Sequence, residues 1–393
     1  MIHVDKHPLF SLGFRPLYIA GCAWACIAVA IWVFAPQWAA QPLSGVAWHA
    51  HEMLWGFIAT TAMGFLLTAS ATWTGLNPSK GKHLAVVCVL WLIARIGYLF
   101  AGQTGFWIAA ICDFAFFAVS GIALARIIIR SKSKRNYGIP LLALGLGISH
   151  ALYVMAALDQ RHDELMRQFG LGLICMAILA LLIARRVIPF FTMRAIPGVT
   201  LPMCARSGHA QLVCAVVALA AVAMRHPTPA AVFLALSGAL SLWQLWHWQT
   251  PGIYRRPLLW ILHLGYAVMA IGLLLAAAQL AGITQGSFAR MAAPAHMLGM
   301  GGFCLLIIGM VSRTSLGHLG RPMALDRSML ASYVAMVAAV ALRLAALWPS
   351  GAYLSLLHAS AFCWILSLGL YLWRFTPWML RPRPDTGGPT IIR

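Results

Sequence analysis

The stretch LYIAGCAWACIAVAIWVFA at residues 17–35 contains no charged residue and no proline. A membrane-spanning helix needs about 20 consecutive apolar residues, so this stretch is typical of one. Eleven similar stretches follow, near 49–73, 84–101, 107–126, 138–158, 168–190, 209–224, 230–250, 258–281, 289–312, 328–348 and 352–373. The sequence therefore predicts an all-α, polytopic membrane protein with twelve transmembrane helices, in one integral membrane domain over residues 1–393.

The composition excludes a soluble multidomain protein. Hydrophobic residues make up 62% of the chain and charged residues only 9%, against about 45–50% and about 25% in soluble proteins. The net charge of +20 would suggest nucleic-acid binding in a soluble protein. In a membrane protein, however, the positions of the basic residues decide what the charge means.

The basic residues alternate between the two sides of the predicted helices. Of the 28 Lys and Arg residues, 22 lie in the N-terminus, the even-numbered loops and the C-terminal tail. The odd-numbered loops hold only Arg161, Arg167, Arg225 and Arg290, and Arg95 and Arg343 lie inside predicted spans. The positive-inside rule places both termini in the cytoplasm. The excess of basic residues is thus explained by the orientation of the protein in the membrane, and we expect a lipid bilayer and no nucleic acid as its partner. The first apolar run is too long for a signal peptide, whose core has about 7 to 15 residues.

The fourteen histidines are the most informative residues, because a polar side chain inside a span must be satisfied by something. In the predicted orientation one group lies at the outer level of the membrane: His49, His51, His150, His296 and His358. A second, looser group lies near the cytoplasmic ends: His83, His209, His247, His263 and His318. The outer group could supply the imidazoles of a copper or haem site, although a single histidine in a span more often bonds a neighbouring helix.

Residues beside these histidines suggest further roles. His49 and His51 point about 200 degrees apart on a regular helix and therefore face two different partners. Glu52 is a candidate partner of an imidazole N–H or a proton relay. Tyr153, three residues after His150, is a candidate proton or electron donor, although packing explains it equally well. His296 and Met300 share one helix face and suit copper or haem.

Three further charges lie within predicted spans. Arg95 and Asp113 on neighbouring spans either pair with each other, or Arg95 or Arg343 neutralises the propionates of a haem. The sequence also shows a weak internal similarity, since His51 and His296 are each followed by Met-Leu and Gly-Phe, with Gly64 and Gly309 thirteen residues later. Such helices would occupy related positions if a four-helix unit repeats.

Several motifs resemble the NnrS family, in an order that covers nearly the whole chain. They are FSLGFRP at 10–16, WHAHEMLWGF at 48–57, GFLLTASATWTG at 64–75, RVIPFFT at 186–192, LHLGY at 262–266, HMLGMGG at 296–302, SRTSLGHLGRP at 312–322 and WRFTPWMLRPRPD at 373–385. Taken together in this order, they form a specific signature.

The resemblance implies a multi-pass protein of the bacterial inner membrane that contains haem and copper and is associated with denitrification and resistance to nitric oxide. It implies metal or haem ligation by His49, His51, His263, His296 and His318, with His150 in a matching position on the fifth helix. His358 belongs to no quoted motif. Because His263 and His318 lie toward the cytoplasmic side, either a second haem is held there, or the predicted helix ends are misplaced, or these two are structural. The resemblance leaves open whether nitric oxide is bound, sensed or reduced.

Two classes of function compete at this point. The first is a nitric-oxide-reactive oxidoreductase, with electrons from quinol or a periplasmic donor, or a haem-bearing sensor without turnover. The second is a twelve-helix transporter, for which broken helices at matching places in two halves and ionisable residues at the midplane are typical. We interpret the prolines and glycines within the spans as unpaired between halves, which disfavours the transporter.

Overall fold

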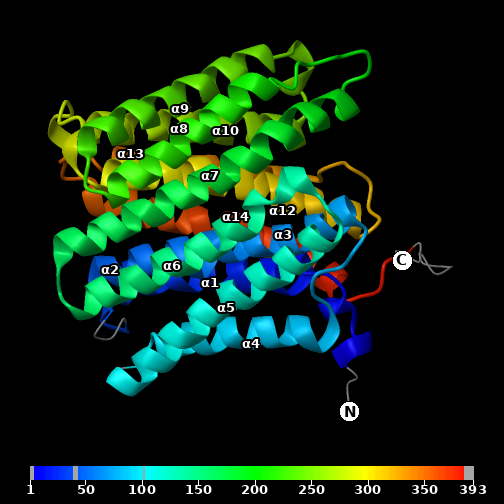
Figure 1. Cartoon of the computed structure of the whole chain (residues 1–393), viewed down its shortest axis with the longest axis horizontal. Helices are drawn as coiled ribbons and strands as arrows, with labels where there is room; N and C mark the ends of the chain where they lie inside the picture. The colour runs from blue at the N-terminus through cyan, green and yellow to red at the C-terminus, as the bar shows by residue number, and fades with distance from the viewer. Residues whose placement is uncertain (1–3, 39–42, 101, 385–393) are drawn as a thin grey trace. The chain divides into compact units, whose positions relative to one another are not determined.

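The computed structural model describes residues 4–38, 43–100 and 102–384, which are almost entirely helical (Figure 1). Twelve helical runs occupy the positions predicted from the sequence. In chain order they are α1 (Phe14–Phe34), α2–η4–α3 (Gly45–Thr74), α4 (Gly81–Gly97), α5 (Gln103–Arg130), α6 (Gly138–Leu158), α7 (His162–Ala195), α8 (Ala205–Ala223), α9 (Pro227–His247), α10 (Pro257–Leu280), α11–η8–α12 (Ala292–His318), α13 (Arg327–Ala345) and α14 (Tyr353–Met379).

Eleven of these runs are long and apolar enough to cross a membrane. The twelfth, α4, has 17 residues, at the lower end of the usual range of about 17 to 25. Large apolar side chains cover the outside of the helices; Ile111, Leu141 and Phe362 are each more than 60% exposed. Such a surface suits lipid and not water. The prediction of an all-α, polytopic membrane protein is therefore confirmed.

The chain divides into two compact units. Unit 1 consists of residues 1–172, 311–323 and 368–393, and unit 2 of residues 173–310 and 324–367. Within unit 1, α4 packs on α5 and α5 on α6, and α1 packs along η4 and α3. Within unit 2, α8, α9 and α10 lie side by side, and α10 packs along η8 (Figure 1).

Two helical runs each contain a wide π-helical segment, which follows a short first α-helix in both. In one run α2 (Gly45–His51) leads into the π-helix η4 (Glu52–Ala59) and then α3 (Thr60–Thr74). In the other, α11 (Ala292–His296) leads into the π-helix η8 (Met297–Cys304) and then α12 (Leu305–His318). Each π-helix starts directly after a histidine and has eight residues. The offset of 245 residues between the two segments equals the offset from His51 to His296.

Close helix contacts repeat with nearly the same offset. A Cβ added to Gly64 would lie 3.0 Å from Leu17 Cβ, and one added to Gly309 would lie 2.8 Å from Ile261 Cγ2. Similarly, a Cβ on Gly21 would lie 2.8 Å from the Thr61 hydroxyl, and one on Gly265 would lie 2.8 Å from the Leu306 backbone nitrogen. The two positions on α1, Leu17 and Gly21, correspond to Ile261 and Gly265 at an offset of 244 residues. Their partners, Gly64 and Thr61, correspond to Gly309 and Leu306 at an offset of 245 residues.

These contacts indicate that α1 and the run α2–η4–α3 are repeated by α10 and the run α11–η8–α12. The interpretation of the glycines as unpaired between halves was therefore wrong. At least three of them, Gly21, Gly56 and Gly64, recur at Gly265, Gly301 and Gly309. Of these pairs, the sequence showed only Gly64 with Gly309. The other two are not apparent there because few residues around them are identical, whereas their role, close approach of two helices, is shared.

We expect Gly265→Ala to lower the free energy of unfolding by about 1 to 3 kcal/mol, because the added methyl would meet a backbone nitrogen that cannot move aside. Gly170→Ala is the matched control, since a Cβ there meets nothing within 4 Å. The measurement is thermal unfolding of the full-length protein in detergent. Equal unfolding temperatures of the two variants would contradict the close contact.

Candidate metal centre

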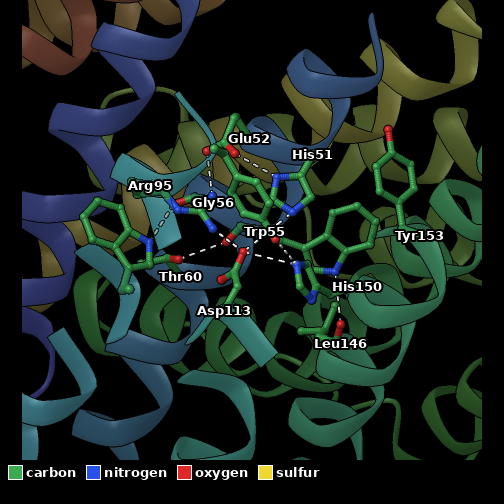
Figure 2. Close-up of polar contacts among 12 residues, drawn as sticks. His51, Glu52, Trp55, Gly56, Thr60, Arg95, Asp113, Leu146, His150 and Tyr153 are labelled. Carbon is green, nitrogen blue, oxygen red and sulfur yellow. Dashed lines mark hydrogen bonds and ion pairs between the residues drawn. The ribbon is translucent and has the colours of Figure 1, made fainter. Parts of the chain in front are cut away.

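Four consecutive spans of unit 1 bring polar side chains to one buried cluster. His51 ends α2 and Glu52 begins η4, whereas Arg95 lies near the end of α4, Asp113 on α5 and His150 on α6. All five side chains are 0% exposed. Figure 2 shows them converging on one point between the helices. Because the spans alternate in direction, residues early in one span and late in the next share one level of the unit.

The cluster is organised around the guanidinium of Arg95. Its Nη1 donates to Glu52 Oε2 at 2.6 Å, and its Nη2 forms an ion pair with Asp113 Oδ2 (Figure 2). Trp24 Nε1 donates to the same Glu52 oxygen at 2.5 Å. The predicted pairing of Arg95 with Asp113 is therefore present, and Glu52 is a second partner that the sequence did not suggest.

Gly56, one turn after Glu52, is required for this approach. A Cβ on Gly56 would meet the Arg95 guanidinium and would lie 2.7 Å from Glu52 Oε2. The Gly56 carbonyl in turn accepts a hydrogen bond from Trp91 Nε1 at 3.1 Å. The π-helical turn and the glycine together open the space in which the ion pairs form.

His51, Asp113 and His150 form a group that could hold a metal ion. One ligand atom from each lies within 4.8 Å of the other two. The Nε2 atoms of His51 and His150 lie 3.6 Å and 3.3 Å from Asp113 Oδ2. His51 Nε2 and Asp113 Oδ1 are buried and have no hydrogen-bond partner among the described residues. Buried polar atoms without a partner are uncommon in proteins and require an explanation, and a bound ion is one such explanation.

The charges of the cluster favour a cation. Glu52 and Asp113 supply two carboxylates, but Arg95 supplies only one positive charge. With neutral imidazoles the cluster therefore carries a formal charge of −1 among side chains that are fully buried. An uncompensated buried charge is strongly unfavourable, so a bound cation or an added proton would stabilise the site.

Glu52 also fixes the orientation of His51. Its Oε1 lies 2.8 Å from His51 Nδ1, so the Nδ1–H donates to the carboxylate and Nε2 is left as the lone-pair nitrogen. A carboxylate behind the imidazole is the usual arrangement around metal-binding histidines. The prediction of Glu52 as partner of an imidazole N–H is confirmed.

The other candidates of unit 1 lie outside this group. The His49 ring stacks on Trp32 with centroids 5.0 Å apart, so His49 and His51 face different partners as predicted. Tyr153 packs against the His51 ring, but its hydroxyl points away from the cluster in Figure 2 and donates to the Ala47 carbonyl at 2.7 Å. His318 packs on Phe14, at the start of α1. Trp24, which bonds Glu52, lies about 15 Å further along that helix.

Three further candidates belong to unit 2. His263 Nδ1 donates to the Leu259 carbonyl at 3.0 Å, and His296 Nδ1 donates to the Ala292 carbonyl at 2.7 Å. Because a carbonyl only accepts, each neutral ring keeps its lone pair on Nε2. Arg343 near the end of α13 has a buried Nη1 without a hydrogen-bond partner among the described residues.

The roles of two residues of the site were missed by the sequence analysis. Asp113 was considered only as a partner of Arg95, although a carboxylate inside a span is itself a signal of a site. Tyr98, directly after α4, was not considered, and its hydroxyl lies 3.1 Å from His150 Nε2. Its position three residues after Arg95, on the same helix face, was the available signal.

We expect Arg95→Gln to destabilise the protein by about 3 to 5 kcal/mol, because it leaves two buried carboxylates without their cation. Arg167→Gln is the control; Arg167 pairs with Glu164 in a partly exposed position, and its loss should cost under about 1 kcal/mol. Thermal unfolding in detergent measures both. The double variant Arg95→Gln with Glu52→Gln should recover part of the loss, and a double variant no more stable than Arg95→Gln would speak against the buried ion pair.

Comparison with known proteins adds one match. Residues 8–383 match the family described as NnrS protein. No curated protein and no solved structure shows a significant match. Since the matched region covers nearly the whole chain, including every residue of the cluster, the chain belongs to the NnrS family.

Proposed function

We propose that this protein binds nitric oxide at a metal ion held by His51, Asp113 and His150. The observation that carries the proposal is the buried group of two imidazoles and a carboxylate in which His51 Nε2 and Asp113 Oδ1 have no partner among the described residues. The net negative charge of the cluster and the carboxylate behind His51 support a cation at this position.

The donor set fits copper, which the family resemblance implies. Two imidazole nitrogens and one carboxylate oxygen suit copper, and they equally suit ferrous iron. Held by these three residues, a reduced ion of either kind would supply the chemistry for binding a diatomic ligand. The residues around it hold the site in shape: Glu52 keeps the proton on His51 Nδ1, and Arg95 keeps Asp113 ionised and oriented.

The surroundings of the cluster suit an uncharged, lipophilic ligand. Its side chains are fully buried between helices, and the large apolar residues Trp55, Phe106 and Tyr153 lie around it, each at most 2% exposed. Nitric oxide dissolves in the bilayer and needs no polar channel to reach such a place. The environment therefore supports nitric oxide better than a charged substrate.

A haem remains part of the proposal. His296 and His263 carry their ring proton on Nδ1, which leaves Nε2 as the nitrogen that would bind iron. With a haem as second redox centre, the protein could reduce two nitric oxide molecules with two electrons and two protons to nitrous oxide and water. We place the protein in the bacterial inner membrane, with quinol or a periplasmic carrier as electron donor.

A transporter is the second candidate, and the internal repeat favours it. Matching irregular segments in two halves of a chain are typical of carriers. However, η4 and η8 continue as helices and are not unwound, and Glu52, Arg95 and Asp113 form a closed ion-pair cluster. The metal content of the purified protein distinguishes the two functions.

We expect the full-length protein purified in detergent to contain about one copper or iron ion per chain at this site, and His51→Ala or Asp113→Asn to remove it. His247→Ala is the matched control, because His247 is exposed and, in the described part of the chain, its ring forms a hydrogen bond only with the Trp243 carbonyl of its own helix. Metal analysis gives the ratio, and difference absorption spectra after anaerobic addition of nitric oxide report binding. Metal-free wild-type protein, or equal metal in wild type and His51→Ala, would refute the proposed site.

We expect Tyr98→Phe to strengthen metal binding by up to about tenfold. The Tyr98 hydroxyl lies 3.1 Å from His150 Nε2 and must release this atom before a metal can take it. A neutral hydrogen bond is worth about 0.5 to 1.5 kcal/mol, which sets the size of the effect. Competition with a chelator of known affinity measures it, with Tyr137→Phe, an exposed tyrosine, as control. Weaker binding by Tyr98→Phe would show that the hydroxyl supports the metal site instead.

A further inference from the structure

Two side chains donate hydrogen bonds to backbone carbonyls that lie five residues back in the same helical run. The Thr60 hydroxyl donates to the Trp55 carbonyl at 2.9 Å (Figure 2), and the Cys304 thiol donates to the Gly299 carbonyl at 3.0 Å. Both donors are buried; Thr60 is 0% exposed and Cys304 is 1% exposed. Thr60 directly follows η4, and Cys304 is the last residue of η8. The two copies of the repeat thus end their π-helices in the same way.

The spacing of five residues distinguishes these two bonds from the usual ones. Thr68, Thr192 and Ser241 lie in regular α-helices and donate to carbonyls four residues back, as hydroxyl side chains in helices commonly do. Five residues of a regular helix turn the chain by about 500 degrees, so the fifth carbonyl back faces about 140 degrees away from the side chain. A π-helical turn, which is wider, brings this carbonyl under the side chain. The bonds of Thr60 and Cys304 can therefore form only while the turn stays π-helical.

Two consecutive carbonyls of η4 accept hydrogen bonds from side chains. The backbone N–H of Thr60 bonds to the Phe57 carbonyl, three residues back, while its hydroxyl bonds to the Trp55 carbonyl. The next carbonyl, that of Gly56, accepts a hydrogen bond from Trp91 Nε1 at 3.1 Å. A buried carbonyl that loses its partner is unfavourable. The Thr60 hydroxyl therefore favours the π-helical form of η4 over a regular helix.

Trp55 connects the Thr60 hydroxyl to the candidate metal position. The centroid of the Trp55 ring lies 5.5 Å from that of His51 and 6.0 Å from that of His150. Thr60 thus holds the backbone of the residue whose side chain packs against both imidazoles. A regular helix over residues 52–59 would turn His51 by about 100 degrees relative to α3. The His51 ring, whose centroid now lies 5.1 Å from that of His150, would then face another helix.

We propose that Thr60 and Cys304 hold η4 and η8 in the π-helical form, and that Thr60 thereby positions His51 for metal binding. Thr60 acts through Trp55 and not as a ligand of the metal. Only the statement about metal binding rests on the proposed function. The role of the two donors in η4 and η8 stands independently of any metal.

Hydrogen–deuterium exchange of the full-length protein in detergent tests the role of Thr60. Thr60→Val keeps the shape of the side chain and removes the donor. We expect the amides of residues 52–60 to exchange at least fivefold faster in this variant, because a buried carbonyl without its partner shifts an equilibrium by roughly five- to 150-fold. Thr60→Ser restores the hydroxyl and should exchange as wild type does. Thr192→Val, which loses a bond to the carbonyl four residues back in α7, is the matched control and should leave residues 52–60 unchanged.

The second copy of the repeat supplies a reciprocal control. Cys304→Ala should speed exchange in residues 297–304 at least twofold, a smaller effect because a thiol is a weaker donor, and should leave residues 52–60 unchanged. Thr60→Val should in turn leave residues 297–304 unchanged. Peptides from α9 report unfolding of the protein as a whole and should exchange equally in all variants. Faster exchange of α9 in Thr60→Val would show that the threonine serves the whole fold, which would overturn the proposal.

Metal binding tests the positioning role of Thr60. We expect Thr60→Val to bind copper at least fivefold more weakly in competition with a chelator, and Thr60→Ser, Thr192→Val and Cys304→Ala to bind it as wild type does. Equal exchange of residues 52–60 in wild type and Thr60→Val overturns the proposal, and so does faster exchange with unchanged copper affinity. If wild type binds no metal, the proposed function fails together with the positioning of His51, whereas faster local exchange still supports the role of Thr60 in η4.

Discussion

The ion pairs of Arg95 with Glu52 and Asp113 are the constraint on which unit 1 depends. Three charges are fully buried, and none can move without leaving another uncompensated. The bridge ties three spans together at one level. It also fixes the two groups that surround the candidate metal position, since Glu52 orients the ring of His51 and Asp113 faces both imidazoles. The site and the packing of the helices are thus one structure, and a change to either alters both.

Much of this architecture follows from the sequence because the bilayer imposes it. A span must satisfy its backbone internally and present apolar side chains, so length and hydropathy alone locate the twelve helices. The same physics marks His51, Glu52, Arg95 and Asp113, because a polar group inside a span needs a reason to be there. Hydropathy does not show which of these groups contact one another. Those contacts depend on the rotation of each helix about its own axis, and hydropathy carries little information about rotation when the whole helix is apolar.

The π-helical segments explain why the partners of Glu52 could not be predicted. Angular arguments from the sequence assume 100 degrees per residue, and they hold for His49 and His51 within the regular helix α2. They fail from Glu52 onward, where the helix widens. In addition, the outer histidines were grouped by depth alone. Depth brought His51 and His150 together correctly, but it carried no information on the separate surroundings of His49 beside Trp32.

The wide turn after His51 also affects how the gene of such a protein can change. A π-helical turn holds an additional residue and absorbs the rotation of about 100 degrees that this residue would add to a regular helix. Deletion of one residue between 52 and 59 would therefore restore a regular helix and leave Gly64 facing Leu17 on α1. The change would fall on the turn itself, where Gly56 leaves room for Arg95 to reach Glu52. One deleted codon could thus remove the buried cluster while the close contact between the helices is kept.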